Sequence, residues 1–324
     1  MKEVKRLRRV VAIALVMLIL GALLGGCRPL VSDEGQPISV YATFYPMYVL
    51  TDAVMRDVPD ASLHCLVQPQ DGCLRAYQLS DWDASLLASG ADAVIAGGRG
   101  LESFESTLFG WGDAGPAISA VLYNLELYNQ QDSVGSDGEA QSHLRGPNPH
   151  LYMSIEGAGQ IIESISAMMV SLDPDYAGLY VENQSAAIAR LEALLASTRE
   201  ELSAFRGEKV ALMNEALIYV ANDYGFEVAE WIDRESGTSL IGPELDACLE
   251  RLSASGARVV LIERQAPQAL MEALEAAGYG VAPVDILSTH VEGEGFDRYI
   301  EIQSANAQAI REAFERADGG KESH

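Results

Sequence analysis

The chain has 324 residues and a formal net charge of −25, with 22 Lys and Arg against 47 Asp and Glu. So acidic a surface repels phosphate backbones, and we expect no nucleic-acid partner. It attracts cationic ligands, but it also keeps an exported protein soluble, and charge alone does not separate these two roles. The sequence contains no GxxxxGK[ST], GxSxG or HExxH motif, so we predict that the chain is not an enzyme.

The first 26 residues are predicted to be an export signal. Five basic residues among the first nine precede an apolar run at 10–20. The following Leu24-Gly25-Gly26-Cys27 resembles a bacterial lipobox, in which the Cys becomes the lipid-modified first residue. We therefore expect a lipid anchor at Cys27, a tether at 27–37, and a location in the cell envelope on the outer face of the cytoplasmic membrane. An uncleaved membrane anchor is the alternative. Without residues 1–26 the formal charge becomes −29.

Strand and helix patterns alternate along the rest of the chain. In the first half we predict strands at 38–43, 61–66 and 93–96, and helices at 47–55 and through 82–87. In the second half we predict strands at 210–213, 227–231, 259–262 and 281–284, and helices at 215–223, 243–255, 266–277 and 296–316. This alternation predicts an α/β fold with two lobes, each a mostly parallel sheet flanked by helices. The lobes are expected at 38–152 and 207–317, with connecting helices at 153–206 and a tail at 318–324.

One long helix, Asp173 to Arg206, is predicted to join the two lobes. Asp173 suits an N-cap, and Gly207 supplies a stop. One apolar stripe at helical spacing is formed by Ile188, Leu191, Leu195, Leu202 and Phe205. A helix of this length would span about 50 Å. We expect it to be the sole link between the lobes, with a ligand cleft beside it and limited closure.

Three further features have local interpretations. Cys65 and Cys73 flank a turn-rich loop and are a possible disulfide in an oxidising compartment, while Cys248 is expected to be a buried small hydrophobe. The Gly97-Gly98-Arg99-Gly100 run lacks dinucleotide-binding spacing and is best explained as a tight turn. Residues 129–147 have little to bury and are expected to form a surface loop.

The order of motifs along the mature chain resembles the zinc and manganese ABC-importer substrate-binding lipoproteins (cluster A-I, periplasmic solute-binding protein family 9). The matching segments are VYATFYPMY at 40–48, YQLSDWD at 77–83, GLESF at 100–104, NPH at 148–150, NEA at 214–216 with DYG at 223–225, ESGT at 235–238, and VD at 284–285. The resemblance implies one zinc or manganese ion between two lobes joined by a backbone helix. It also implies an ABC permease with its ATPase subunit as partner. We expect a monomer.

Carried over by position, the family's four metal ligands fall on Arg75, His150, Asn214 and Asp285. Arg75 is an altered ligand position, because a guanidinium does not lose its proton and cannot coordinate a cation. Asn214 offers only a neutral carbonyl oxygen, a weak donor for zinc. Neighbouring Glu215 is therefore a further candidate ligand.

The missing first ligand has two candidate replacements, Cys73 and His64. Each carried-over residue also has a structural interpretation. His150 could be a hydrogen-bonded loop histidine, Asp285 could cap the next turn, and Arg75 could pair with Asp285.

Asn214 and Glu215 lie where a helix begins, and Asn is a common cap there, while Glu suits the positive helix end. The alternative function is a protein of the same fold that has lost or altered its metal site and binds or senses another small solute through Arg75.

Overall fold

The computed structural model describes residues 37–67, 77–112, 115–128, 147–232, 240–287 and 294–319. Cys27, Cys73 and Arg75, together with most of the 129–147 loop, lie outside these residues, so the expectations that rest on them remain predictions. None of the described helices combines the length and the apolar character needed to cross a bilayer.

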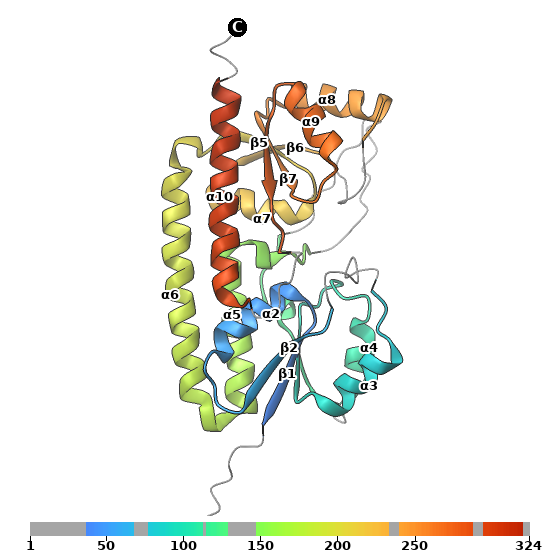
Figure 1. Cartoon of the computed structure of the whole chain (residues 1–324), viewed down its shortest axis with the longest axis vertical. Coiled ribbons are helices and arrows are strands. Elements are labelled where there is room, and N and C mark those ends of the chain that lie inside the picture. Colours follow the sequence, from blue (N-terminus) through green and yellow to red (C-terminus); the bar gives the residue numbers. More distant parts are fainter. Residues whose placement is uncertain are drawn as a thin grey trace, which may run out of the picture. The chain divides into compact units, whose positions relative to one another are not determined.

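The N-terminal lobe contains a four-stranded parallel sheet in the order β2-β1-β3-β4 (Figure 1). The strands are β1 (Ile38–Ala42), β2 (Ala61–Cys65), β3 (Ala93–Ala96) and β4 (Ala117–Ala120). The α-helices are α2 (Tyr45–Met55), α3 (Asp81–Gly90) and α4 (Glu105–Gly110), and short 3₁₀ turns follow at η3 (Val121–Asn124) and η4 (Leu151–Met153). The β3 strand is buried along its whole length, as expected for an apolar strand covered on both faces.

The C-terminal lobe repeats this arrangement with a parallel sheet in the order β6-β5-β7-β8. Its strands are β5 (Lys209–Leu212), β6 (Glu227–Trp231), β7 (Val259–Glu263) and β8 (Gly280–Val284). Its helical elements are η7 (Glu215–Leu217), α7 (Ile218–Tyr224), α8 (Pro243–Ser255), α9 (Gln268–Ala276) and α10 (Phe296–Gly319). The predicted two-lobed α/β class is confirmed. The β4 strand and α4 were not predicted, because each has only four to six residues and a weak apolar pattern.

The predicted long helix is broken into several pieces. The connecting region consists of α5 (Ile155–Leu172), η5 (Pro174–Tyr176), α6 (Ala177–Glu201) and η6 (Ser203–Phe205). Of the helix predicted at 173–206, only residues 177–201 form a continuous α-helix, α6, whose 25 residues span about 38 Å. Asp173 lies at the N-cap position of η5, but its side chain makes no capping hydrogen bond, and its carboxylate accepts a 2.8 Å hydrogen bond from the Tyr180 hydroxyl. Gly207 has a φ of 81°, as expected for a stop.

The expectation that this helix is the sole link between the lobes was wrong. The C-terminal helix α10 packs on β8 of its own lobe and also contacts α2 of the N-terminal lobe and α6. At its far end, the rings of Phe314 and Phe205 stack with their centroids 4.6 Å apart. The two lobes are therefore joined by α10 as well as by the connecting helices.

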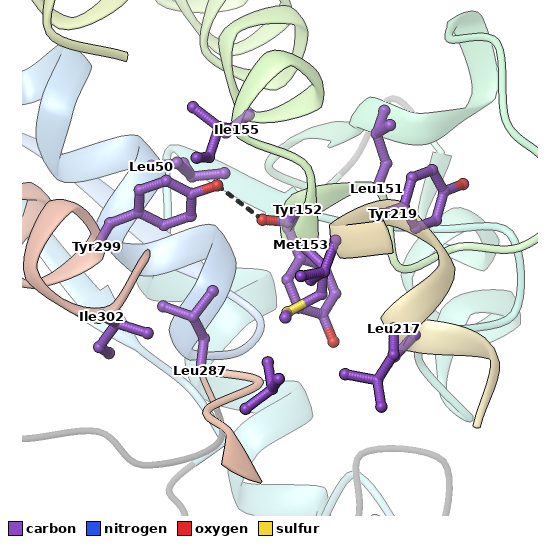
Figure 2. Packing of buried hydrophobic residues seen from close by; sticks show 14 of the residues in the cluster. Leu50, Leu151, Tyr152, Met153, Ile155, Leu217, Tyr219, Leu287, Tyr299 and Ile302 are labelled. Atoms are coloured by element: carbon purple, nitrogen blue, oxygen red, sulfur yellow. Dashed lines mark hydrogen bonds between the residues drawn. The ribbon is translucent and has the colours of Figure 1, made fainter. Parts of the chain in front are cut away.

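Helix α10 also holds the segment at 152–154 in place (Figure 2). The buried Tyr299 hydroxyl donates to the carbonyl oxygens of Tyr152 at 3.0 Å and Ser154 at 3.2 Å. Gln303 Nε2 donates to the carbonyl of Met153 at 3.3 Å. A C-terminal helix thus fixes the backbone immediately after the predicted ligand His150.

Candidate ligand site at the lobe junction

His150 is held by its neighbour Asn148, which is almost fully buried. Asn148 Oδ1 accepts a hydrogen bond from the His150 backbone N–H at 3.1 Å and lies 2.9 Å from His150 Nδ1. Asn148 Nδ2 donates to the carbonyl of Glu215 at 2.7 Å, so its oxygen is the atom that faces the ring. Nδ1 therefore carries the proton, and Nε2 carries the lone pair that a cation requires.

Glu215 is the second predicted ligand at this place. Its Oε1 lies 3.9 Å from His150 Nδ1, and both side chains are mostly buried. The Tyr219 hydroxyl donates to the carbonyl of Asn148 at 2.6 Å and fixes the same segment from the C-terminal lobe. The structure thus brings His150 and Glu215, which come from different lobes, together.

Asn214 serves a structural role. Its Oδ1 accepts a 3.2 Å hydrogen bond from the Ala216 backbone N–H, which caps η7, and its Nδ2 donates to Glu263 Oε1. Glu263 is 3% exposed. The observed contacts of Asn214 are therefore those of a helix cap. Its role as a metal ligand stays a prediction.

Asp285 follows β8, and three of its polar groups form hydrogen bonds. Its backbone N–H donates to Asn306 Oδ1 at 2.8 Å, and its carbonyl accepts from Asn306 Nδ2 at 2.9 Å. Its Oδ1 accepts a 2.9 Å hydrogen bond from the Leu287 backbone N–H, so it caps the next turn. The second carboxylate oxygen, Oδ2, is not part of this turn.

Asp285 pairs with a cation that sequence reasoning missed. Arg264 Nη1 lies 3.7 Å from Asp285 Oδ2. The signal for this contact is the strand register, because Glu263 and Val284 are paired at the ends of β7 and β8, and the next residue of each strand comes at the same sheet edge. The pairing of Arg75 with Asp285 remains a prediction, since Arg75 lies outside the described residues.

Of the two candidate replacements for the first ligand, Cys73 lies outside the described residues, and His64 is not brought to this place by its contacts with described residues. His64 is exposed on β2, where its ring stacks on Tyr41 with centroids 4.7 Å apart. Cys65 Sγ lies 3.5 Å from the carbonyl oxygen of Val67. A disulfide to Cys73 stays a prediction, because Cys73 is not among the described residues. Cys248 is buried, as expected.

The Gly97–Gly100 turn encloses a carboxylate of the chain itself. Glu102 accepts hydrogen bonds from the Gly97 and Gly98 backbone N–H groups at 2.8 and 2.9 Å and from Thr43 Oγ1 at 2.7 Å. Burial raises the pKa of Glu102, and these three hydrogen bonds oppose the rise. The turn prediction is confirmed by positive φ angles at Gly98, Arg99 and Gly100. The Gly97 and Gly98 N–H groups of this turn therefore bind a carboxylate of the chain itself.

The described donor side chains do not form a complete metal shell. Within the part of the chain that the structure describes, no three His, Cys, Asp or Glu side chains lie close enough together to hold one. His150 and Glu215 form one pair of donors, and Asp285 faces Arg264. A pocket of about 420 Å³ lies elsewhere, where α6 meets α7, and its lining includes Arg199, Arg206 and Asp223 but none of the predicted ligands. A complete metal shell therefore needs a further donor or a rearrangement of these side chains.

Comparison with known proteins identifies the chain's relatives. Iron-binding protein YfeA of Yersinia pestis is 28% identical over 209 residues, which cover 62% of this chain and 61% of that protein. High-affinity zinc uptake system protein ZnuA of Bacillus subtilis is 22% identical over 293 residues, covering 87% and 89% of the two chains. Thus the chain spans about three fifths of YfeA and most of ZnuA.

Solved structures share the fold. The solute-binding protein FpvC of Pseudomonas aeruginosa in complex with Mn²⁺ superposes with a TM-score of 0.73 at 19% identity, covering 87% of this chain and all of that one. Zn(II)-bound AdcA of Streptococcus pneumoniae gives a TM-score of 0.71 at 22% identity, covering 86% of this chain and 58% of that one. The family profile described as zinc-uptake complex component A, periplasmic, matches residues 40–313. This chain therefore belongs to the zinc-uptake complex component A family.

Proposed function

We propose that the protein is the extracytoplasmic solute-binding component of an ABC importer and that its cargo is a divalent transition metal ion, zinc or manganese. In this role it delivers cargo to a permease with its ATPase subunit and carries out no catalysis. The proposal includes the lipid anchor at Cys27, the location outside the cytoplasmic membrane and the monomeric state.

The observation that carries the proposal is the pairing of His150 with Glu215, with His150 Nδ1 3.9 Å from Glu215 Oε1, in a chain of this family. An imidazole nitrogen and a carboxylate oxygen are ordinary zinc ligands, and carboxylate oxygen also suits manganese. The orientation of His150 is set by Asn148, so the lone pair is placed on Nε2 before any ion arrives. The formal charge of −29 on the mature chain further favours a cationic cargo.

The test is calorimetric titration of the metal-stripped protein with Zn²⁺ and with Mn²⁺. We expect saturable binding that falls at least tenfold in His150→Ala and Glu215→Gln. Glu192→Gln, which removes an exposed carboxylate from α6, is the matched control and should bind like the natural protein. An Arg75→His variant, which restores an orthodox ligand type at the altered position, should bind more tightly. Absence of binding by the natural protein and by Arg75→His would overturn the metal proposal.

A second candidate function has one specific observation in its favour. Arg264 places a guanidinium beside Asp285, and a guanidinium recognises carboxylate and phosphate groups. A small anionic or zwitterionic solute, bound by Arg264 or Arg75, is therefore the alternative cargo. Failure of both metals in the titration, combined with thermal stabilisation by a panel of small carboxylates, would support it.

A further inference from the structure

We infer that Arg264 is an internal competitor for the cargo, which sets the cation affinity of the site by occupying the Asp285 carboxylate. The inference rests on the proposed function, because it assumes that a metal ion uses Asp285. It assigns a role in affinity to a residue that lies outside the four carried-over ligand positions.

The contact is built into the sheet. The Arg264 backbone N–H donates to the carbonyl of Val284 at 2.8 Å, which continues the β7–β8 ladder by one residue beyond Glu263. Arg264 is therefore held next to Asp285 by backbone pairing. Its side chain is 50% exposed, whereas that of Asp285 is 10% exposed. The carboxylate is thus fixed and the guanidinium is able to turn into solvent.

The two carboxylate oxygens of Asp285 contact different partners. Oδ1 accepts the hydrogen bond from Leu287 and shapes the turn after β8. Oδ2 faces Arg264 at 3.7 Å, a distance that marks an ion pair and is longer than a good hydrogen bond. Oδ2 is the oxygen that a cation can coordinate without competing with the Leu287 N–H, and it is also the oxygen that Arg264 contacts.

Arg264 and a metal ion cannot share this oxygen at low cost. A zinc–carboxylate bond is about 2 Å long, so an ion on Oδ2 would lie within about 6 Å of Arg264 Nη1 in the observed position. The guanidinium does not deprotonate, so the repulsion is relieved only when the side chain moves away. The ion pair must break for cargo to bind, and its re-formation favours release.

The experiment compares Zn²⁺ and Mn²⁺ affinities, by competition with a chelator of known affinity, for the metal-stripped full-length chain in detergent. Arg264→Gln removes the charge and should bind at least tenfold more tightly. Arg264→Lys keeps the charge and should stay within about threefold of the natural protein. Arg311→Gln removes one positive charge from α10, where Arg311 pairs with Glu201 and Glu315, and controls for net charge. A thermal melt of each variant checks folding.

Salt provides a second readout. The Debye length falls from about 10 Å at 0.1 M to about 3 Å at 1 M salt, so the difference between Arg264→Gln and the natural protein should shrink in 1 M NaCl. A merely structural effect of the substitution would not depend on salt in this way.

The possible outcomes separate the two proposals. If Arg264→Gln and the natural protein bind metal equally well, the inference about Arg264 fails and the proposed function stands. If Arg264→Gln binds more weakly, Arg264 helps to hold the cargo and the inference is wrong. If neither protein binds either metal, the competitor role fails, and the proposed function fails with it when Arg75→His binds neither metal as well.

Discussion

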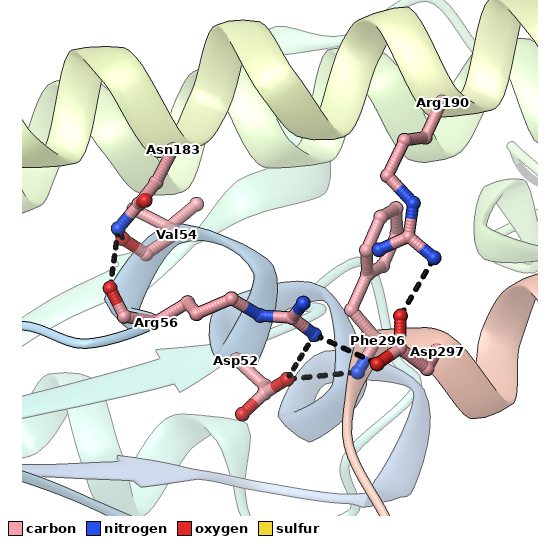
Figure 3. A network of polar contacts seen from close by, with 7 residues as sticks. All are labelled: Asp52, Val54, Arg56, Asn183, Arg190, Phe296 and Asp297. Carbon is pink, nitrogen blue, oxygen red and sulfur yellow. Dashed lines mark hydrogen bonds and ion pairs between the residues drawn. The ribbon is translucent and has the colours of Figure 1, made fainter.

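Asp52 Oδ2 accepts a hydrogen bond of 2.8 Å from the backbone N–H of Phe296, so a side chain of α2 caps the first turn of α10 (Figure 3). Arg56 Nη2 lies 3.8 Å from the same carboxylate oxygen and 3.3 Å from Asp297 Oδ2. Arg190 of α6 reaches the other oxygen of Asp297 at 2.6 Å and lies over the Phe296 ring. Hydrogen bonding from Arg190, reinforced by Arg56, lowers the pKa of Asp297. Three helices therefore meet in one polar network.

Gly295 tests how closely this network is packed. A Cβ at Gly295 would lie 2.0 Å from Asp52 Oδ2, so Gly295→Ala must push the carboxylate away from the start of α10. We expect a loss of about 1–3 kcal/mol in the free energy of unfolding, measured by urea denaturation. In Gly178→Ala on α6, where nothing lies within 4 Å of the new Cβ, stability should be unchanged or rise by up to about 1 kcal/mol. Equal effects of the two substitutions would show that the docking of Asp52 contributes nothing.

The Glu102→Gln substitution is conservative in size, but we expect it to destabilise the fold strongly. Its Oε2 accepts from Gly98 and its Oε1 from Gly97 and Thr43, all inside the fold. In Glu102→Gln one of these oxygens becomes an NH₂ group that faces N–H or O–H donors, which leaves buried donors unpaired. We expect the free energy of unfolding to fall by about 1–3 kcal/mol, measured by urea denaturation.

The control for Glu102 is Glu192→Gln, the same chemical change at an exposed position of α6. Surface substitutions of this kind usually change stability by less than about 0.5 kcal/mol. If Glu102→Gln stays within that range as well, the three hydrogen bonds do not stabilise the turn.

Local patterns predicted most of the elements. The Glu227–Trp231 strand and the Pro243–Ser255 helix were placed at their observed bounds, because each has clear periodicity and turn residues at its ends. The long helix was overextended at 173–176 and 202–206, since propensity and spacing do not distinguish a 3₁₀ turn from the end of an α-helix.

Contacts between distant residues were not predictable in the same way. Asp52 and Phe296 are 244 positions apart, and nothing in either segment marks the other as its partner. Arg264 lies two residues after the strand predicted at 259–262, and its contact with Asp285 follows only from the order and register of β7 and β8. The family resemblance supplied only the expected ligand positions, whereas the contacts that occupy Asn214 and Asp285 required the fold.

Asp223 is expected to make stability depend on pH. Its carboxylate accepts hydrogen bonds from Ile155 N at 2.6 Å and Ser154 Oγ at 2.8 Å, and so links α7 to the start of α5. Burial raises the pKa of Asp223 to about 6, although these hydrogen bonds and Arg199 lower it. Because the pKa of Asp223 in the folded protein exceeds the ordinary aspartate value of 3.8, the stability that protonation contributes is complete below about pH 4 and is lost as the pH rises through about 6.

The comparison of natural protein with Asp223→Asn isolates this effect. Between about pH 4 and pH 7 the unfolding free energy of the natural protein should fall relative to that of the variant, by up to about 3 kcal/mol. Urea denaturation at a series of pH values measures the difference. Asp175→Asn, at an exposed position of η5, controls for the change in net charge. A constant difference between the natural protein and Asp223→Asn across this range would contradict the assignment.

Asn306, a buried residue of α10, holds the backbone of Asp285 in position. It is fully buried, and its amide group satisfies both the N–H and the carbonyl of Asp285, at 2.8 and 2.9 Å. Asn306→Ala leaves these two buried backbone groups unpaired, so we expect the unfolding free energy to fall by about 2 kcal/mol or more. Since the backbone of Asp285 would no longer be fixed, its carboxylate would be less well positioned, and metal affinity in the calorimetric titration should fall as well.

The control is Gln308→Ala, two residues further along α10, where the side chain is exposed and donates a hydrogen bond to the nearby Glu312. It should leave both stability and metal affinity close to those of the natural protein. Titrations at a temperature where Asn306→Ala is fully folded separate a positioning effect from simple unfolding. If the folded variant binds metal as tightly as the natural protein, Asp285 is either positioned by other contacts or is not a ligand, and titration of Asp285→Asn then distinguishes the two.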